Sequence, residues 1–207
     1  GAFKAELYKL AIATEPRSDA GIFRLPVQRV FSAKGFGTVV TGIPISGAVQ
    51  VGETVEVLPA GKLAKVRGIQ AYQEASPRAR AGHSAAFNLS DVTLEEVRRG
   101  DVIATPGFFK PVTMVAAAFE ARPTLETPLH DRLQARLHVG TAEVVGELVL
   151  LDQDKVEPGA KVLVQLRLEE PVVCAPGDRF VLRLASPALT LGGGAILEES
   201  RHRLKRK

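Results

Sequence analysis

The sequence predicts an all-β protein made of two consecutive small antiparallel β-barrels, with a short helix before them. From Val27 onward, short apolar runs rich in Val, Leu and Phe are separated by glycine roughly every ten to fifteen residues, which is typical of short strands joined by tight turns. Two sets of such runs, at about 22–106 and 110–199, are divided by the segment PGFFKP at 106–111. The length of 207 residues allows one large domain or two small ones, which agrees with a pair of barrels.

The N-terminal residues carry the helical signal. Leu7, Leu10 and Ala11 follow the i, i+3, i+4 spacing of one helical face, so a helix is expected over residues 4–14. Pro16 ends this pattern, and the segment RSDAG behind it is interpreted as a linker. Residues 1–21 are therefore expected to form a helix and connector ahead of the first barrel.

The strand-like runs are entered through a glycine with a polar neighbour. A tight entry to a strand often needs a positive φ, which a Cβ disfavours. Such entries precede TVEVL, SAAFNL and VIAT in the first set, and AKVLVQL and RFVLRL in the second. Residues 91–101 are expected to hold one helical turn, which Gly100 stops. In the run VLVQLRL, Leu163, Gln165 and Arg167 share one face of the strand, and the residues between them share the other.

The composition excludes several classes of protein. With 45% hydrophobic and 24% charged residues, the chain is globular rather than disordered. Cys174 is the only cysteine, so an intrachain disulfide is excluded and a reducing, cytoplasmic setting is expected; the residue itself is interpreted as a buried small hydrophobe rather than a reactive thiol. The four histidines are scattered, which disfavours a metal site. No uncharged run is long enough to span a membrane as a helix.

Motifs for nucleotide binding or catalysis are missing from the sequence. There is no P-loop, and the glycine pair Gly35 and Gly37 leads into the strand-like run VVTG rather than into a helix that could receive a phosphate. The glycine run 192–194 is interpreted as a bulge or barrel corner that needs no ligand. No G-x-S-x-G elbow is present. We therefore predict no catalytic residue, metal or cofactor within this chain.

The formal net charge of +4 is unevenly distributed. Five of the cations lie within the last seven residues, so residues 1–200 carry a net charge of −1. Nonspecific coating of nucleic acid through bulk charge is disfavoured, and a polyanion would have to contact local patches or the basic tail at 200–207. The tail is interpreted either as an RNA contact or as a solvated linker.

Two long segments resemble the second domain of translational GTPases. The segment PVQRVFSAKGFGTVVTGIPISGAVQVGETVEVLP at 26–59 is similar to the P-x-x-x-V-F-S…G-x-G-T-V-V-T-G run of elongation factor Tu. The segment AGHSAAFNLSDVTLEEVRRGDVI at 81–103 resembles the later strands of the same barrel and ends in its E-x-x-R-G element at 96–100. The resemblance implies the second and third domains of such a factor, both β-barrels.

Other segments resemble the selenocysteine-specific elongation factor, the SelB type. They are FRLP at 23–26, Lys34-Gly35, VRGIQ at 66–70, RLHVGTAE at 136–143 and LTLGGG at 189–194. This resemblance covers about residues 22–199. It implies a longer parent protein, in which an upstream domain binds GTP and Mg and hydrolyses the GTP, with residues 4–14 as that domain's last helix or a connector. Winged-helix modules that bind a selenocysteine-insertion hairpin in the messenger RNA would follow downstream.

The resemblance also implies a site for the aminoacyl end of selenocysteinyl-tRNA. Gln28, Arg29 and Arg99 occupy the amino-acid pocket positions, where a cationic pocket favours an ionised selenol over the neutral hydroxyl of serine. Gln28 stands where the family has an acidic residue. Its amide can accept a hydrogen bond from the α-amino group of the aminoacyl ester but cannot form an ion pair with it. Glu96, Gly35 and Gly37 correspond to positions around the terminal adenosine and the acceptor end. On residue type alone, a solvated surface is the favoured interpretation for Arg29, Arg98 and Arg99.

The second barrel is implied to contact the tRNA backbone, with Arg132, Arg136 and His138 as the candidates. Arg136 and His138 alternate with Leu137 and Val139, so they share a face that is either an RNA contact or merely solvated. The implied function is delivery of selenocysteinyl-tRNA to the ribosome. Two alternatives stay open: barrels of another translational GTPase that bind the ribosome or a partner protein, and an interaction module without an RNA ligand.

Overall fold

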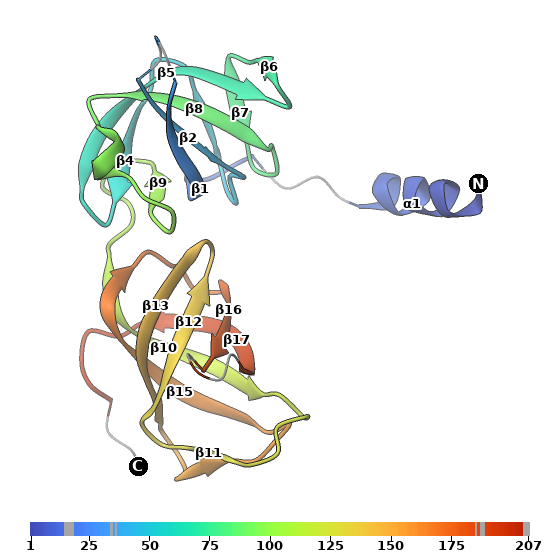
Figure 1. Ribbon diagram of the computed structural model, residues 1–207, viewed down its shortest axis with the longest axis vertical. Coiled ribbons are helices and arrows are strands. Elements are labelled where there is room, and N and C mark those ends of the chain that lie inside the picture. The colour runs from blue at the N-terminus through green and yellow to red at the C-terminus, as the bar shows by residue number, and fades with distance from the viewer. Residues whose placement is uncertain (15–18, 34, 36, 185, 187–188, 205–207) are drawn as a thin grey trace.

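The computed structural model (Figure 1) describes residues 1–14, 19–33, 35, 37–184, 186 and 189–204. Helix α1 spans Ala2–Ala13, beginning slightly earlier than the predicted 4–14, and none of its residues is buried. Figure 1 shows that α1 stands apart from both barrels. Pro16 and part of the predicted linker lie outside the described residues. Among the described helices, none is long and apolar enough to cross a membrane.

The first barrel is formed by strands between Arg24 and Ala104. Its main strands follow the order β4-β9-β1-β2-β8-β5, and antiparallel pairing of β4 with β5 closes the ring. Two short strands, β3 and β7, form a separate ribbon, and β6 extends the sheet from β5. The bounds are β1 (Arg24–Ala33), β2 (Gly37–Gly42), β3 (Ala48–Gln50), β4 (Thr54–Leu58), β5 (Lys62–Ala71), β6 (Glu74–Ala75), β7 (Arg78–Arg80), β8 (Ala85–Ser90) and β9 (Val102–Ala104). The predicted helical turn is present as a 3-10 helix, η1 (Leu94–Glu96).

The second barrel is closed by β10, β15, β13, β12, β16 and β17 in that order, all antiparallel. A two-stranded ribbon of β11 and β14 stands beside it. The bounds are β10 (Val112–Ala121), β11 (Leu129–His130), β12 (Leu133–Val139), β13 (Ala142–Leu150), β14 (Lys155–Val156), β15 (Lys161–Val172), β16 (Arg179–Arg183) and β17 (Thr190–Glu199). The predicted fold of two antiparallel barrels with a short N-terminal helix is confirmed.

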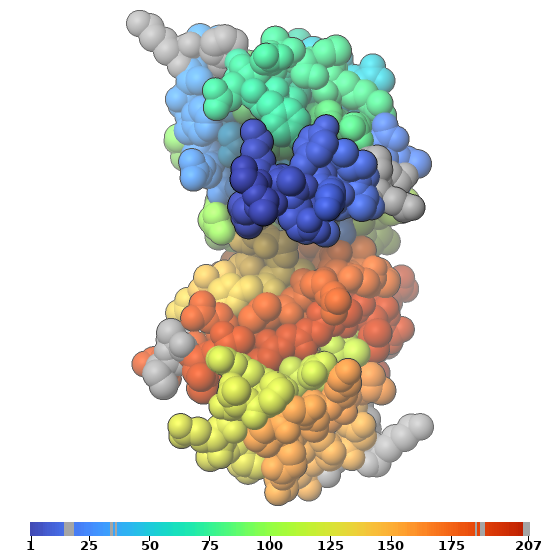
Figure 2. All heavy atoms as spheres, turned by 90° about the vertical axis from the view of Figure 1, so that its right-hand side faces the viewer, coloured from blue at the N-terminus to red at the C-terminus, as the bar shows by residue number. Residues whose placement is uncertain are grey.

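Each barrel has its own apolar core, which is built from the inward-facing residues that alternate along its strands. Phe87 is 1% exposed in the first core, and Phe119 is 1% exposed in the second, where it stacks on Phe180 at a centroid distance of 6.5 Å. Cys174 is buried as predicted, and burial raises the pKa of its thiol to about 12. Because the two cores are separate, Figure 2 shows two bodies stacked along the long axis of the molecule.

The glycine run 192–194 lies on β17, which pairs with β10 and β16 on its two sides. A Cβ on Gly194 would lie 1.8 Å from the carbonyl oxygen of Ala118, and one on Gly193 would lie 2.7 Å from that of Phe180. Both pairings of β17 contain register shifts. The shifts flank the glycine run, at Leu191 and Leu197, while the run itself keeps regular register, so the expected bulge or barrel corner borders the glycines and does not include them. The glycines instead permit the close contact between strands.

The C-terminal tail covers part of the second barrel. The side-chain amide of Gln165 donates to the carbonyl of His202 at 2.8 Å and accepts from the backbone N–H of Leu204 at 3.1 Å. Arg167 donates to the carbonyl of Leu204 at 3.1 Å. Gln165 is thereby fully buried, although strand alternation places it on the outer face with Leu163, which is exposed. Residues 201–204 are thus anchored to β15 rather than being a free linker, while residues 205–207 lie outside the described part of the chain.

A largely buried ion pair joins the two barrels. The guanidinium of Arg24, at the start of β1, donates two hydrogen bonds of 2.6 Å to the carboxylate of Asp178, just before β16. Arg24 is 7% exposed and also lies over the ring of Phe109, 5.2 Å from its centroid. Asp178 additionally accepts from the backbone N–H of Ala175 at 2.9 Å. A second inter-barrel pair, Arg98 with Glu170 at 2.7 Å, is solvent-exposed.

Breaking the buried pair should destabilise the protein far more than breaking the exposed one. We expect Arg24→Ala to lower the free energy of unfolding by about 3 kcal/mol, because it leaves the Asp178 carboxylate uncompensated between the barrels. The control Arg98→Ala should lower it by less than about 1 kcal/mol, because water screens that pair. Urea denaturation of both variants measures the difference, and equal losses would contradict the assignment of Arg24 and Asp178 as the connection between the barrels.

Candidate functional site

A β-bulge in β1 places two consecutive side chains on the outside of the first barrel. Val27 pairs with Gly42 and Arg29 with Thr41, so Gln28 is the extra residue. Strand alternation would turn one of Gln28 and Arg29 inward, but both are exposed. At the bulge, Val27 instead bonds to the segment after η1: its N–H donates to the carbonyl of Asp101 at 2.8 Å, and its carbonyl accepts from Gly100 at 3.2 Å.

This backbone pairing brings Arg99 to the bulge. The Arg99 guanidinium donates to the main-chain carbonyl of Gln28 at 3.3 Å. Arg99 therefore lies at the bulge that carries Gln28, which is followed directly by Arg29 in β1, although 71 positions separate Gln28 from Arg99 in the sequence. The role of these three residues as an amino-acid pocket stays a prediction. Within the described part of the chain, neither Arg29 nor Arg99 forms an ion pair with a carboxylate. Two unneutralised guanidinium groups make this place favourable for an anionic group.

Asp101, which sequence reasoning did not select, holds the loop that carries Arg99. Its carboxylate accepts from the backbone N–H of Arg98 at 2.8 Å, and the residue is 6% exposed. Burial raises the pKa of this carboxyl, against the opposing effect of the Arg98 N–H. Its position directly after Gly100 in a loop was the sequence signal that could have identified it.

An apolar hollow of about 330 Å³ lies beside the bulge on the outer face of β1, β2, β5 and β8. Phe31 lines it and is 44% exposed, two residues after Arg29 on β1. The amides of Gln70 and Asn88 supply its polar groups. Sequence reasoning missed these three residues. Phe31 is two residues after Arg29, so strand alternation could have placed it on the same outer face. Asn88 lies near it only because β8 pairs with β2 and β5, and local sequence does not predict that pairing.

Gly35 and Gly37 line a second, more open hollow of about 650 Å³, with Arg67 and Asp91. Asn88 borders both hollows, so they adjoin one another. Gly35 and Gly37 have φ angles of 84° and 73°, which explains the choice of glycine at the β1–β2 turn. Lys34 and Phe36, which were part of the same motif, lie outside the described residues.

Glu96 borders neither hollow. It closes a capping box on η1, where its carboxylate accepts from the backbone N–H of Thr93 at 2.9 Å. The same carboxylate accepts a hydrogen bond from the ammonium group of Lys62, at the start of β5. These contacts, led by the bond from Lys62, lower the pKa of Glu96. The carboxylate is thus already engaged, and its predicted contact with the terminal adenosine remains a prediction.

The three side chains predicted to contact RNA on the second barrel, Arg132, Arg136 and His138, lie at β12 and beside carboxylates of β13. Arg136 donates a hydrogen bond to Glu143, and Nδ1 of His138 lies 3.9 Å from the same carboxylate. The bond from Arg136 is the main cause of the lowered pKa of Glu143. Arg132 lies 3.5 Å from Glu147. Arg136 and His138 share the outer face as predicted, but the structure pairs each candidate with an acidic side chain.

No group of three or more metal-ligating side chains occurs in the part of the chain that the structure describes.

Comparison with known proteins identifies relatives of both barrels. Residues 37–104 match the family described as elongation factor Tu domain 2, and residues 116–203 match the selenocysteine-specific elongation factor, beta-barrel domain. The chain is 37% identical over 203 residues to a selenocysteine-specific elongation factor of Desulfomicrobium baculatum, covering 98% of this chain and 32% of that protein. The apo crystal structure of translation elongation factor SelB from Methanococcus maripaludis superposes with a TM-score of 0.85 at 25% identity, covering 96% of this chain and 48% of that one. The chain therefore spans about a third of the curated relative and about half of the solved one.

Proposed function

The chain belongs to the selenocysteine-specific elongation factors, of which it comprises two β-barrel domains, and we propose that it binds the aminoacyl end of selenocysteinyl-tRNA for delivery to the ribosome. GTP hydrolysis would reside in an upstream domain that holds GTP and Mg, since neither matched family model is a GTP-binding domain. Downstream winged-helix modules would recognise the messenger RNA. The observation that carries the proposal is the hydrogen bond that brings the Arg99 guanidinium to the Gln28 bulge, where Arg29 is the next residue of β1.

Charge is the basis of the proposed amino-acid selectivity. A selenol is largely ionised near neutral pH, whereas the hydroxyl of serine is not. Arg29 and Arg99 have no carboxylate partner among the described residues, so their charge is available to an anionic side chain. A serine at the same place would leave the cations without a counter-charge and gain only neutral hydrogen bonds.

The two adjoining hollows support a place for the end of the tRNA. The apolar hollow beside Phe31 suits the face of a nucleobase, and the Asn88 amide can exchange hydrogen bonds with the base edge. Gly35 and Gly37 leave the β1–β2 turn without side chains, so that the acceptor strand can approach its backbone. Glu96 would contribute only by exchanging its bond from Lys62 for one from the nucleotide.

Contact between the second barrel and the tRNA backbone would involve Arg132, Arg136 and His138. The two arginines would have to share their charge between a phosphate and the adjacent Glu143 or Glu147, and His138 lies beside Glu143 as well. We therefore propose that this face positions the tRNA and contributes little net charge to its affinity.

Arg99→Ala should remove the discrimination between selenocysteine and serine. We expect the dissociation constant of seryl-tRNA divided by that of selenocysteinyl-tRNA, on the same tRNA body, to fall about tenfold or more, because a charge-assisted hydrogen bond to the selenocysteine side chain is lost. The neighbouring Arg98→Ala, which removes an exposed pair with Glu170, is the matched control and should leave the ratio unchanged. Equal affinity of the unaltered protein for both aminoacyl-tRNAs would refute the selenol pocket itself.

Gln28→Asp should strengthen binding of aminoacylated tRNA in general. A carboxylate at the bulge can pair with the α-amino group of either aminoacyl ester, so we expect a gain of about tenfold for both. Deacylated tRNA lacks that amine and serves as the control ligand, which should show no gain. An identical gain for deacylated tRNA, or none for any ligand, would show that residue 28 does not face the amino acid.

A further inference from the structure

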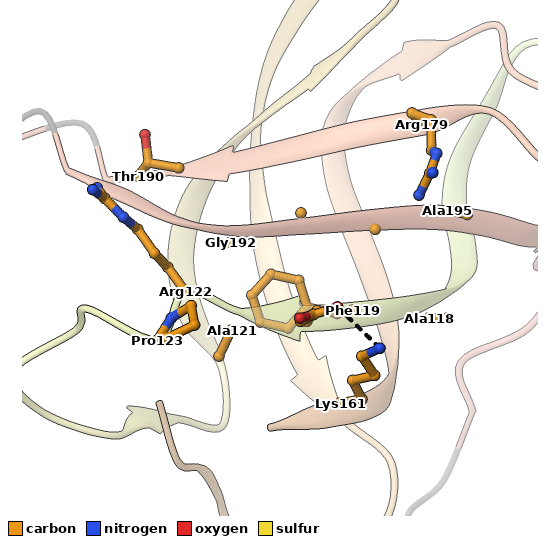
Figure 3. Close-up of a pocket in the computed structure, with 13 residues that line it drawn as sticks. Ala118, Phe119, Ala121, Arg122, Pro123, Lys161, Arg179, Thr190, Gly192 and Ala195 are labelled. Carbon is orange, nitrogen blue, oxygen red and sulfur yellow. Dashed lines mark ion pairs between the residues drawn. The ribbon is translucent and has the colours of Figure 1, made fainter. Parts of the chain in front are cut away.

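A second cationic hollow lies on the wall of the second barrel opposite the β12–β13 face. In the ring order β10-β15-β13-β12-β16-β17, the adjacent strands β10 and β17 stand across the barrel from β12 and β13. A surface hollow of about 500 Å³ opens there, at the end of β10 and along β17 (Figure 3). It is distinct from the bulge at Gln28 and from Arg132, Arg136 and His138 at β12.

Part of the lining of this hollow is bare main chain. The glycine run 192–194 lines it, and close contact of β17 with its neighbours excludes a Cβ at each position of the run. The hollow therefore follows from barrel packing itself, and it leaves peptide groups of β17 accessible where other strands present side chains.

The charged groups at this hollow differ from those on β12. Figure 3 shows Arg122 reaching toward Thr190 at one end of the hollow and Arg179 lying over Ala195 at the other. Both arginines are exposed, and neither is ion-paired with any carboxylate that the structure describes. Lys161 is paired with Glu120 at 3.3 Å, so these two charges cancel. Arg122 and Arg179 then leave the hollow with two uncompensated positive charges.

We propose that this hollow binds the phosphodiester backbone of an RNA. Two free guanidinium groups and a threonine hydroxyl along a shallow wall match phosphate oxygens. The strand from Thr190 to Ala195 spans about 16 Å, which is long enough for more than one phosphate of a strand. Among the described residues that line the hollow, the only aromatic side chain is Phe119, which is buried in the core. The contact therefore recognises the phosphate backbone and does not distinguish one base sequence from another.

This site does not depend on the amino-acid pocket, so its test uses an RNA without an aminoacyl group. Fluorescence anisotropy would follow binding of a labelled RNA hairpin of mixed sequence to the 207-residue chain over a range of salt concentrations. For the double variant Arg122→Ala/Arg179→Ala we expect weaker binding and a slope of log K against log salt reduced by about 1.5 to 2, as two lost phosphate contacts require. A scrambled hairpin should bind equally well.

The matched control is Lys65→Ala/Lys110→Ala, which removes the same charge from exposed positions elsewhere. This control should keep the wild-type slope, and Arg122→Lys/Arg179→Lys should keep most of the affinity because it retains both charges. An unchanged slope in the arginine double variant, or an equal reduction in the control, would overturn the proposal. A strong preference for one hairpin sequence would also overturn it. All four side chains are exposed, so we expect every variant to fold, and circular dichroism checks this.

Discussion

The ion pair between Arg24 and Asp178 is the interaction on which the arrangement of this molecule depends. The two barrels have separate main cores, and the apolar packing between them is a small cluster, in which Phe109 and Val173 pack against three first-barrel residues: Leu58, Val102 and Ala104. Arg24 is the first residue of β1, and the same strand carries Gln28 and Arg29. A bidentate, nearly buried contact at this point therefore couples the second barrel directly to the strand that presents the proposed pocket. Phe109, in the connection between the barrels, covers the guanidinium and limits access of water.

The pocket itself is produced by an irregularity in a regular fold. A β-barrel normally sends alternate side chains inward, which would allow only one of Gln28 and Arg29 to face a ligand. The bulge overrides this alternation, and the freed backbone of Val27 pairs with the segment 98–101. Asp101 and the capping box of η1 hold that segment in place. The backbone thus brings Arg99 to the bulge beside Arg29, and no carboxylate among the described residues neutralises either guanidinium.

The arginines of this protein fall into two groups, those that are ion-paired with a carboxylate and those that are not. Arg132 and Arg136 are compensated by acidic residues on β13, and Arg98 by Glu170. Arg29 and Arg99 on the first barrel, and Arg122 and Arg179 on the second, have no such partner among the residues described here. In a chain whose first 200 residues carry a net charge of −1, attraction for a polyanion has to come from such uncompensated positions. The basic tail is less free than its composition indicates, because residues 201–204 are bonded to β15.

Local sequence determined the strands, the early helix, the turn at η1 and the outward face of Arg136 and His138, because these depend on periodicity and on turn residues close together in the chain. The motif resemblance further selected Gln28, Arg29 and Arg99, which the fold brings to one place. Only the tertiary structure decided which charges are already neutralised, that Lys62 engages Glu96, that Phe31 and Asn88 border one hollow, and that the tail buries Gln165. Each of these depends on the register between strands far apart in the sequence, and a periodic pattern specifies which face a residue takes but not which distant residue it meets.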